Sequence, residues 1–136
     1  QNLSHTERTI VLGAASFWEG IDVKGTGLTT VVIVKLPFLP PTRAITSAKL
    51  EHLQRQGKNS FSHYSLPQAV LKFRQGCGRL IRTNTDWGAL VILDNRILTK
   101  AYGREFLNSL PPQPIIKAPI DEICQKLSQW MAQKNT

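Results

Sequence analysis

Hydrophobic residues recur at intervals of three and four between Leu66 and Ile81, which is the spacing of one buried face of an α-helix. The members of this stripe are Leu66, Ala69, Val70, Phe73, Cys77, Leu80 and Ile81. A polar set with the same spacing points roughly 170° away from the stripe and consists of Gln75, Gly78, Arg79 and Arg82. The pattern therefore predicts a helix from Leu66 to Arg82 with an apolar inner face and a polar outer face.

The start and the outer face of this helix carry further signals. Ser65 suits the N-cap position, and Pro67 falls in the first turn. Gly76 and Gly78 lie inside the predicted helix, where each costs about 1 kcal/mol relative to alanine. A polar helix face is usually only solvated surface. The two glycines indicate instead that something approaches this backbone closely.

Three runs of apolar and β-branched residues predict buried strands, at Thr9–Leu12, Leu28–Leu36 and Ala89–Leu93. The strongest of them is Leu28–Leu36, which we expect to be buried on both faces. Helical patterns separate the second and third runs. This order of elements is typical of a doubly wound α/β domain with a parallel sheet.

Three further helices are predicted, from Thr42 to Gln56, from Tyr102 to Leu110 and from Ile120 onward. The last one has an apolar stripe and is expected to dock on the core; the stripe consists of Ile123, Leu127, Trp130 and Met131. The prolines before it predict a stiff connector, and they are Pro111, Pro112, Pro114 and Pro119.

Composition adds a partner class and a compartment. The chain of 136 residues has 17 Lys and Arg against 9 Asp and Glu, so its net charge of +8 favours a polyanion such as nucleic acid or nucleotide phosphates. Cys77 and Cys124 are far apart in sequence, and we interpret them as reduced core thiols of a cytoplasmic protein. The cysteines and isolated histidines predict no metal site. No apolar run reaches the ~18 residues of a membrane span.

Candidate chemistry gathers at two places. Glu19 and Asp22 flank Gly20 in a loop after the first predicted strand, where open α/β sheets keep their ligand crevices. Arg79 and Arg82 lie one helical turn apart, which suits a triphosphate because guanidinium groups pair with phosphate oxygens. The sequence contains no Walker A loop and no plausible Walker B segment to hold the rest of a nucleotide and its magnesium. These arginines would therefore act across an interface.

The motif Gln75-x-x-Gly78-Arg79-x-x-Arg82 resembles motif VI of superfamily 2 DNA helicases of the DinG and XPD type. Phe17–Asp22 resembles their motif V. The resemblance covers the chain from about Thr9 through Pro112, and it includes Lys35–Phe38 and Ile92–Arg96.

This resemblance implies a fold and a division of the chain. The implied fold is RecA-like, of the P-loop NTPase type: a parallel sheet with flanking helices, here incomplete at its N-terminal side. Residues 1–112 would be the C-terminal portion of the second motor domain. Residues 113–136 would be the proline-rich connector and the C-terminal amphipathic helix of the same domain.

The resemblance also implies a motor that uses ATP hydrolysis to move along single-stranded DNA, generally 5′ to 3′, and to unwind duplex. Arg79 and Arg82 are expected to contact the γ-phosphate as catalytic residues, and Arg82 is favoured as the arginine finger. The remaining nucleotide-site residues implied by the resemblance are Gln75, Gly78, Glu19, Gly20 and Asp22. The last three belong to the loop that couples the nucleotide site to DNA.

In this family the phosphate loop and the DEAH-like box, which hold ATP and magnesium on a first motor domain, would lie upstream of Gln1. The four-cysteine iron–sulfur insertion found in many members would lie there too. We therefore expect the chain alone to be inactive and to need the first motor domain of the same polypeptide as a partner. The truncated sheet would expose an edge, so we also predict self-association.

DNA contacts are expected from basic residues, namely Lys35, Arg43, Lys49 and Arg96. Lys35, Asp94 and Arg96 either contact DNA or tie the end of the sheet together, and the sequence favours neither. Two other functions stay open. A non-catalytic basic module would bind single-stranded nucleic acid through Arg43, Lys49, Arg55 and Lys58. An α/β enzyme would use Glu19 and Asp22 as an acid/base pair.

Overall fold

The computed structural model describes residues 28–80 and 86–134 of the chain. In chain order, the elements are β1 (Thr30–Ile33), α1 (Ala44–Arg55), the π-helical turn η4 (Phe61–Ser65), α2 (Leu66–Cys77), β2 (Ala89–Ile92), α3 (Arg96–Thr99), α4 (Gly103–Asn108) and α5 (Ile120–Lys134). The predicted strand Thr9–Leu12, the loop with Glu19, Gly20 and Asp22, and Arg82 lie outside the described residues.

β1 and β2 form a parallel pair in which Thr30 lies opposite Ala89 and Ile33 opposite Ile92. The Ala89 N–H donates to the Thr29 carbonyl at 2.9 Å, and the Leu93 N–H donates to the Ile33 carbonyl at 2.9 Å. Parallel strands need a long crossover, and the segment from α1 through α2 supplies it. The described part of the chain thus confirms the mixed α/β fold with a parallel sheet and flanking helices.

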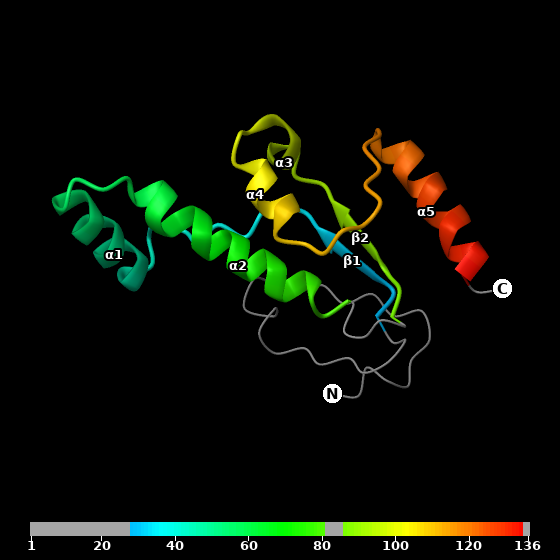
Figure 1. Cartoon of the computed structure of the whole chain (residues 1–136), viewed down its shortest axis with the longest axis horizontal. Coiled ribbons are helices and arrows are strands. Elements are labelled where there is room, and N and C mark those ends of the chain that lie inside the picture. The colour runs from blue at the N-terminus through cyan, green and yellow to red at the C-terminus, as the bar shows by residue number, and fades with distance from the viewer. Residues whose placement is uncertain (1–27, 81–85, 135–136) are drawn as a thin grey trace.

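α2 runs antiparallel to the strands along one face of the sheet (Figure 1). Before α2, Phe61 stacks on Phe38, beyond the carboxyl end of β1, with ring centroids 5.9 Å apart. After α2, Leu80 meets Gly88, just before β2, so closely that a Cβ atom on Gly88 would lie 2.5 Å from the Leu80 side chain. The end of α2 is therefore held beside the amino ends of the strands.

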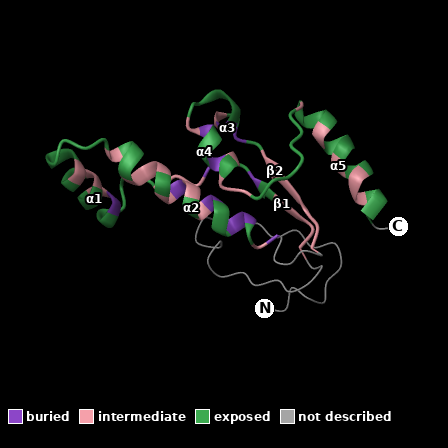
Figure 2. Ribbon diagram, viewed as in Figure 1, coloured by how far each residue is buried: buried purple, intermediate pink, exposed green. Residues whose placement is uncertain are grey.

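The hydrophobic core lies between the strands, α2 and α4 (Figure 2). Phe73 and Phe106 are both 0% exposed, and their rings meet edge to face with centroids 5.3 Å apart. Ile33 and Leu36 bring the end of β1 into the same cluster. Burying such aromatic side chains contributes roughly 1.5–3 kcal/mol each relative to leaving them exposed.

The other face of the strands is open where we expected burial. Val32 is 53% exposed, Val34 64% and Leu93 41%. The predicted strand Leu28–Leu36 also ends early, at Ile33. The expectation of burial on both faces is wrong for these described residues, because side chains alternate along a strand and only the Val31 and Ile33 side meets the core.

α5 meets the described part of the domain at the start of the strands. Trp130 meets Trp87 edge to face with ring centroids 5.6 Å apart, and the Thr30 hydroxyl donates to the Met131 Sδ at 3.7 Å. No residue of α5 is fully buried, and none belongs to the main core cluster. The predicted helix is confirmed, but it lies at the margin of the sheet rather than on the core.

The predicted helices at 42–56 and 102–110 are confirmed as α1 and α4, whereas α3 was not predicted. Ser65 precedes α2 as expected, with Pro67 in the first turn, but its side chain makes no capping hydrogen bond. Ser65 does not cap a free helix end, because η4 continues directly into α2. No helix formed by residues 28–80 and 86–134 is long and apolar enough to cross a bilayer.

The two cysteines differ in their surroundings. Cys77 is buried on α2, and burial raises the pKa of its thiol to about 12, so it is a neutral core side chain as expected. Cys124 is exposed on α5, so the expectation of a core thiol is wrong there. Its position falls on the outer side of a helix that contacts the sheet through only part of its surface.

Candidate functional site

α2 ends one turn earlier than its periodicity predicts. The helix stops at Cys77, and Gly78 occupies the C-cap, where its N–H donates to the Arg74 carbonyl at 2.9 Å. The Leu80 N–H then donates to the Cys77 carbonyl at 3.0 Å, three residues back, which closes a tight turn instead of continuing the α-helix. The predicted helix from Leu66 to Arg82 is therefore wrong for residues 78–80, and Ile81 and Arg82 lie outside the described residues.

This ending accounts for one of the two glycines, Gly78. A Cβ atom on Gly78 would lie 3.2 Å from the Arg74 carbonyl oxygen, so glycine leaves room for the chain to turn. Gly76 is buried inside α2. The approach of an outside group to this backbone stays a prediction.

The candidate nucleotide group is placed at this end of α2. Gln75 and Gly78 are exposed on the last turn, and Arg79 follows them half-buried, with its Nε atom buried. The contact between Leu80 and Gly88 fixes this turn against the start of β2. Three members of the predicted motif are thus brought together on one side of the helix end, while Arg82 lies beyond the described residues.

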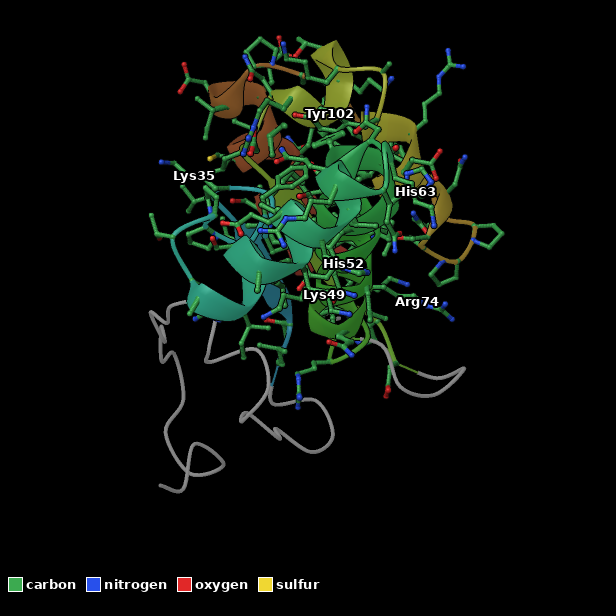
Figure 3. The ribbon with its side chains drawn as sticks, turned by 90° about the vertical axis from the view of Figure 1, so that its left-hand side faces the viewer. Lys35, Lys49, His52, His63, Arg74 and Tyr102 are labelled. Atoms are coloured by element: carbon green, nitrogen blue, oxygen red, sulfur yellow. The ribbon has the colours of Figure 1, made fainter. Side chains whose placement is uncertain are left out.

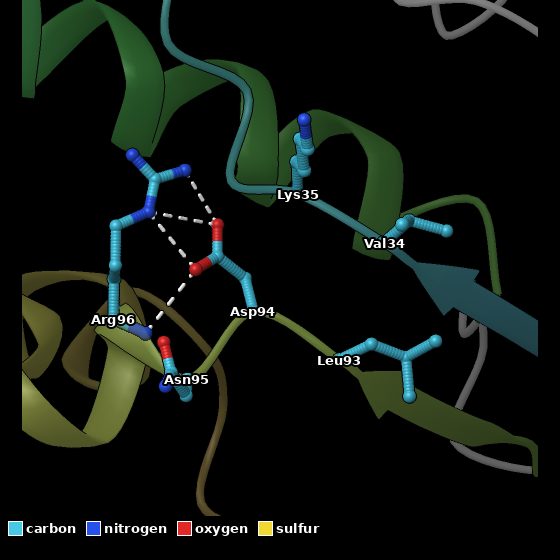
Figure 4. Close-up of a pocket in the computed structure, with 6 residues that line it drawn as sticks. All are labelled: Val34, Lys35, Leu93, Asp94, Asn95 and Arg96. Carbon is cyan, nitrogen blue, oxygen red and sulfur yellow. Dashed lines mark hydrogen bonds and ion pairs between the residues drawn. The ribbon is translucent and has the colours of Figure 1, made fainter.

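A second group of polar residues lies at the opposite, carboxyl end of the strands. Asp94 is only 8% exposed and follows β2 by two residues. Its carboxylate accepts the Leu36 N–H at 2.8 Å. It also accepts the Arg96 N–H at 3.1 Å (Figure 4). Because Leu36 follows β1, this carboxylate joins the ends of both strands.

Asp94 also binds the Arg96 side chain. The Arg96 Nε lies 2.9 and 3.1 Å from the two carboxylate oxygens, and its Nη2 forms an ion pair with the same group. These hydrogen bonds from Arg96, together with the backbone N–H of Leu36, hold the pKa of Asp94 well below its ordinary range. The carboxylate is therefore ionised throughout the neutral pH range.

The Arg96 guanidinium also contacts an aromatic ring. Its guanidinium carbon lies 5.5 Å from the centre of the Phe38 ring, a cation–π distance. Phe38 belongs to an aromatic cluster that the sequence did not predict, and the other members are Phe61, Tyr102 and Phe106. The only sequence signal for it is the Leu-Pro-Phe segment after the strongest strand.

Asp94 and Arg96 line an open, shallow pocket together with Lys35 (Figure 4); the remaining lining residues are Val34, Leu93 and Asn95. Lys35 is exposed, and no carboxylate within the described ranges pairs with it. Between the two readings left open by the sequence, the structure shows that Asp94 ties the strand ends. Lys35 is exposed beside that tie.

The remaining predicted DNA residues lie on and beside α1, at one end of the molecule's long axis (Figure 1). Arg43 immediately precedes α1 and is exposed, and Lys49 is exposed on it. Figure 3 shows Lys49 next to His52 on α1, with Lys35 set apart from both. The four predicted DNA residues therefore fall into two separate groups, Lys35 with Arg96 and Arg43 with Lys49.

Comparison with known proteins covers both the end of α2 and the Asp94 pocket. The sequence model of a family described as the helicase C-terminal domain matches residues 1–113, which include the end of α2 and the Asp94 pocket. The chain belongs to the helicase C-terminal domain family. The resemblance found in the sequence is thereby confirmed.

The relatives of this helicase domain include proteins named as helicases and one named as a nuclease. The chain is 48% identical over 87% of its length to the 3′-5′ exonuclease DinG of Bacillus subtilis, and it covers 13% of that protein. It is 46% identical over 77% of its length to the ATP-dependent DNA helicase YoaA of Escherichia coli, of which it covers 16%. The Escherichia coli ATP-dependent DNA helicase DinG is 38% identical over 90% of the chain, and 17% of that protein is covered.

The helicase domain thus spans less than a fifth of the length of these relatives. The mixed α/β structure with its parallel sheet agrees with a RecA-like helicase C-terminal domain.

Proposed function

We propose that this chain is the C-terminal part of the second motor domain of an ATP-dependent DNA helicase. The complete protein would couple ATP hydrolysis to 5′-to-3′ movement along single-stranded DNA and to duplex unwinding. The observation that carries this proposal is the position of Gln75, Gly78 and Arg79 at one exposed helix end, inside a stretch matched to helicase C-terminal domains.

In this proposal Arg79 and Arg82 supply positive charge to an ATP held by a first motor domain. Guanidinium groups aimed at the γ-phosphate stabilise the charge that develops on its oxygens during phosphoryl transfer. Gln75, Gly78 and the loop with Glu19, Gly20 and Asp22 would complete the nucleotide side of this interface. ATP and magnesium would be bound mainly by the first motor domain, because this sequence has no Walker A loop.

The geometry supports a division of labour between the two ends of the sheet. Among the proposed ATP contacts, Gln75, Gly78 and Arg79 belong to the described residues, and they lie near the amino ends of the strands, where Leu80 meets Gly88. Lys35 and Arg96 lie at the carboxyl ends, beside Asp94. We assign the first end to the nucleotide and the second end, together with Arg43 and Lys49, to single-stranded DNA.

The test is substitution of the arginines in the complete enzyme. Arg82→Ala and Arg79→Ala should each lower DNA-stimulated ATP hydrolysis by about 10³-fold or more, the range seen for arginine fingers. Binding of a fluorescent ATP analogue should be nearly unchanged. Arg74→Ala is the matched control, because Arg74 is exposed on the same helix but lies outside the motif. Near-normal hydrolysis in Arg82→Ala would overturn the assignment.

A second candidate function is a non-catalytic module that binds single-stranded nucleic acid. It is favoured by the exposure of α1 and of the cations on and beside it, which are Arg43, Lys49, Arg55 and Lys58. In that case the motor substitutions above would leave the protein's activity intact. Replacing Lys49 and Lys58 by glutamine would instead remove most of its salt-dependent binding to oligothymidine.

A further inference from the structure

The peptide between Lys35 and Leu36 is held on both sides. Its N–H belongs to Leu36 and donates to the buried Asp94 carboxylate at 2.8 Å. The Leu36 side chain is 4% exposed and belongs to the hydrophobic core. Lys35 precedes it at the bend that follows β1, and its side chain is exposed. The hydrogen bond to Asp94 and the buried Leu36 side chain therefore hold the peptide group that adjoins Lys35.

Asp94 is itself kept in one orientation by Arg96. Both carboxylate oxygens lie within 3.1 Å of the Arg96 Nε, and the guanidinium lies 5.5 Å from the centre of the Phe38 ring. Phe38 closes the same turn, because its N–H donates to the Leu36 carbonyl at 2.8 Å. Arg96, Asp94 and the turn from Lys35 to Phe38 thus form one hydrogen-bonded unit.

The two positive charges of the pocket, on Arg96 and Lys35, differ in whether a carboxylate already neutralises them. The positive charge of Arg96 is matched by Asp94 at ion-pair distance, so the two together add no net charge to the pocket. Lys35 adds one positive charge on the same rim, and it is exposed. A phosphodiester that enters the pocket would therefore find its counter-charge on Lys35 rather than on Arg96.

We propose that Asp94 and Arg96 are positioning residues that hold Lys35 to receive a phosphate of single-stranded DNA. This inference rests on the proposed function. It assigns Lys35 as the phosphate contact of this pocket, and it changes the expected role of Arg96 from a direct DNA contact to a support for Asp94.

The direction in which Asp94→Asn changes the affinity for DNA distinguishes positioning from a simple effect of charge. Asp94→Asn removes a negative charge next to DNA, which by charge alone should strengthen binding. Positioning predicts the opposite, because the amide holds Arg96 and the Leu36 N–H less firmly and Lys35 loses its fixed direction. Arg96→Lys keeps the positive charge but loses the paired contact with both carboxylate oxygens, and it should weaken binding in the same way.

The measurement is the affinity of the complete enzyme for a fluorescein-labelled oligothymidine, by anisotropy over a series of potassium chloride concentrations. Lys35→Gln should weaken binding and lower the slope of log K against log salt by about 0.7, the contribution of one phosphate in a single strand. Asp94→Asn and Arg96→Lys should each weaken binding and reduce the slope in the same direction. Asp121→Asn is the matched control, since Asp121 is exposed on α5.

A double-mutant cycle distinguishes positioning from general loss of structure. If Asp94 acts through Lys35, then Lys35→Gln with Asp94→Asn should bind no more weakly than Lys35→Gln alone. ATP hydrolysis without DNA should stay at the wild-type level in the control Asp121→Asn. If Asp94→Asn does not fold, the same cycle is run with Arg96→Lys.

The outcomes that overturn the two proposals differ. Tighter or unchanged binding by Asp94→Asn, or additive losses in the cycle, would overturn the positioning role while leaving the helicase assignment intact. Unchanged affinity and slope in Lys35→Gln would likewise overturn the inference. A complete enzyme that shows no salt-dependent binding to oligothymidine at all would overturn the proposed function itself.

Discussion

Asp94 is the residue on which the carboxyl end of the sheet depends. It accepts hydrogen bonds from Leu36 after β1 and from Arg96 at the start of α3, while being almost fully buried itself. Asp94→Asn keeps one oxygen acceptor, but it removes the charge and turns an N–H₂ donor toward donors, so these hydrogen bonds are weakened. Its replacement should therefore affect stability as well as DNA binding.

We expect Asp94→Asn to lower the free energy of unfolding at neutral pH by about 1–3 kcal/mol. The folded-state pKa of Asp94 lies below its unfolded value of about 3.9, so its ionic contribution is present above that pH and is lost as the pH falls toward the folded value. The difference between wild type and variant should therefore shrink as the pH is lowered from about 5 to about 2. Urea unfolding followed by circular dichroism at several pH values measures it, and a difference that stays constant over this range would contradict the prediction.

At the scale of elements, two close approaches determine how helices meet their neighbours. One joins the end of α2 to the start of β2 through Leu80 and Gly88. The other joins α3 to α4, where a Cβ atom on Gly103 would lie 2.0 Å from the Ile97 carbonyl oxygen. The second contact is with backbone, which cannot move aside as a side chain can. α4 carries Phe106 into the core, so its position affects the packing of α2 as well.

Gly103→Ala should therefore destabilise the domain, by about 1–3 kcal/mol or more, because the methyl group forces α3 and α4 apart. The thermal midpoint measured by differential scanning fluorimetry should fall accordingly. Arg104→Ala, at the next position of the same helix and exposed, is the control and should leave the midpoint nearly unchanged. A Gly103→Ala protein as stable as wild type would show that this contact is looser than the structure indicates.

At the scale of the whole molecule, the chain forms only a two-stranded sheet within the described residues, with a helix-covered face and an open face. Val32, Val34 and Leu93 are each more than 40% exposed on the open face. Exposed apolar surface and unpaired strand edges both promote association with another chain. A second copy of the chain offers the same exposed apolar surface.

The isolated chain should accordingly self-associate in a concentration-dependent way, as sedimentation velocity would measure. Replacing Val32 and Val34 together by threonine should weaken the association, because both side chains lie on the open face. Ile45→Thr is the control, since Ile45 is 77% exposed but lies on α1, away from the strands. A monodisperse monomer over the whole concentration range would count against this prediction.

The sequence by itself determined the order of the elements and the family, because both depend on local patterns. The apolar stripe of α2 and the β-branched runs of β1 and β2 are visible in short windows, and the motif from Gln75 to Arg79 is contiguous in the chain. The same local rules placed α1, α4 and α5 nearly where they are found.

Only the tertiary structure decided what depends on contacts between distant residues. Periodicity could not show that α2 stops at Cys77, because the tight turn after Gly78 preserves an apolar residue at Leu80. Asp94 and Leu36 lie 58 positions apart, so no sequence window contains their hydrogen bond. The open face around Val32 likewise depends on which helices cover the sheet. Side-chain burial and long-range pairing are properties of the packed chain, and they decide whether a charged residue is a support or a contact.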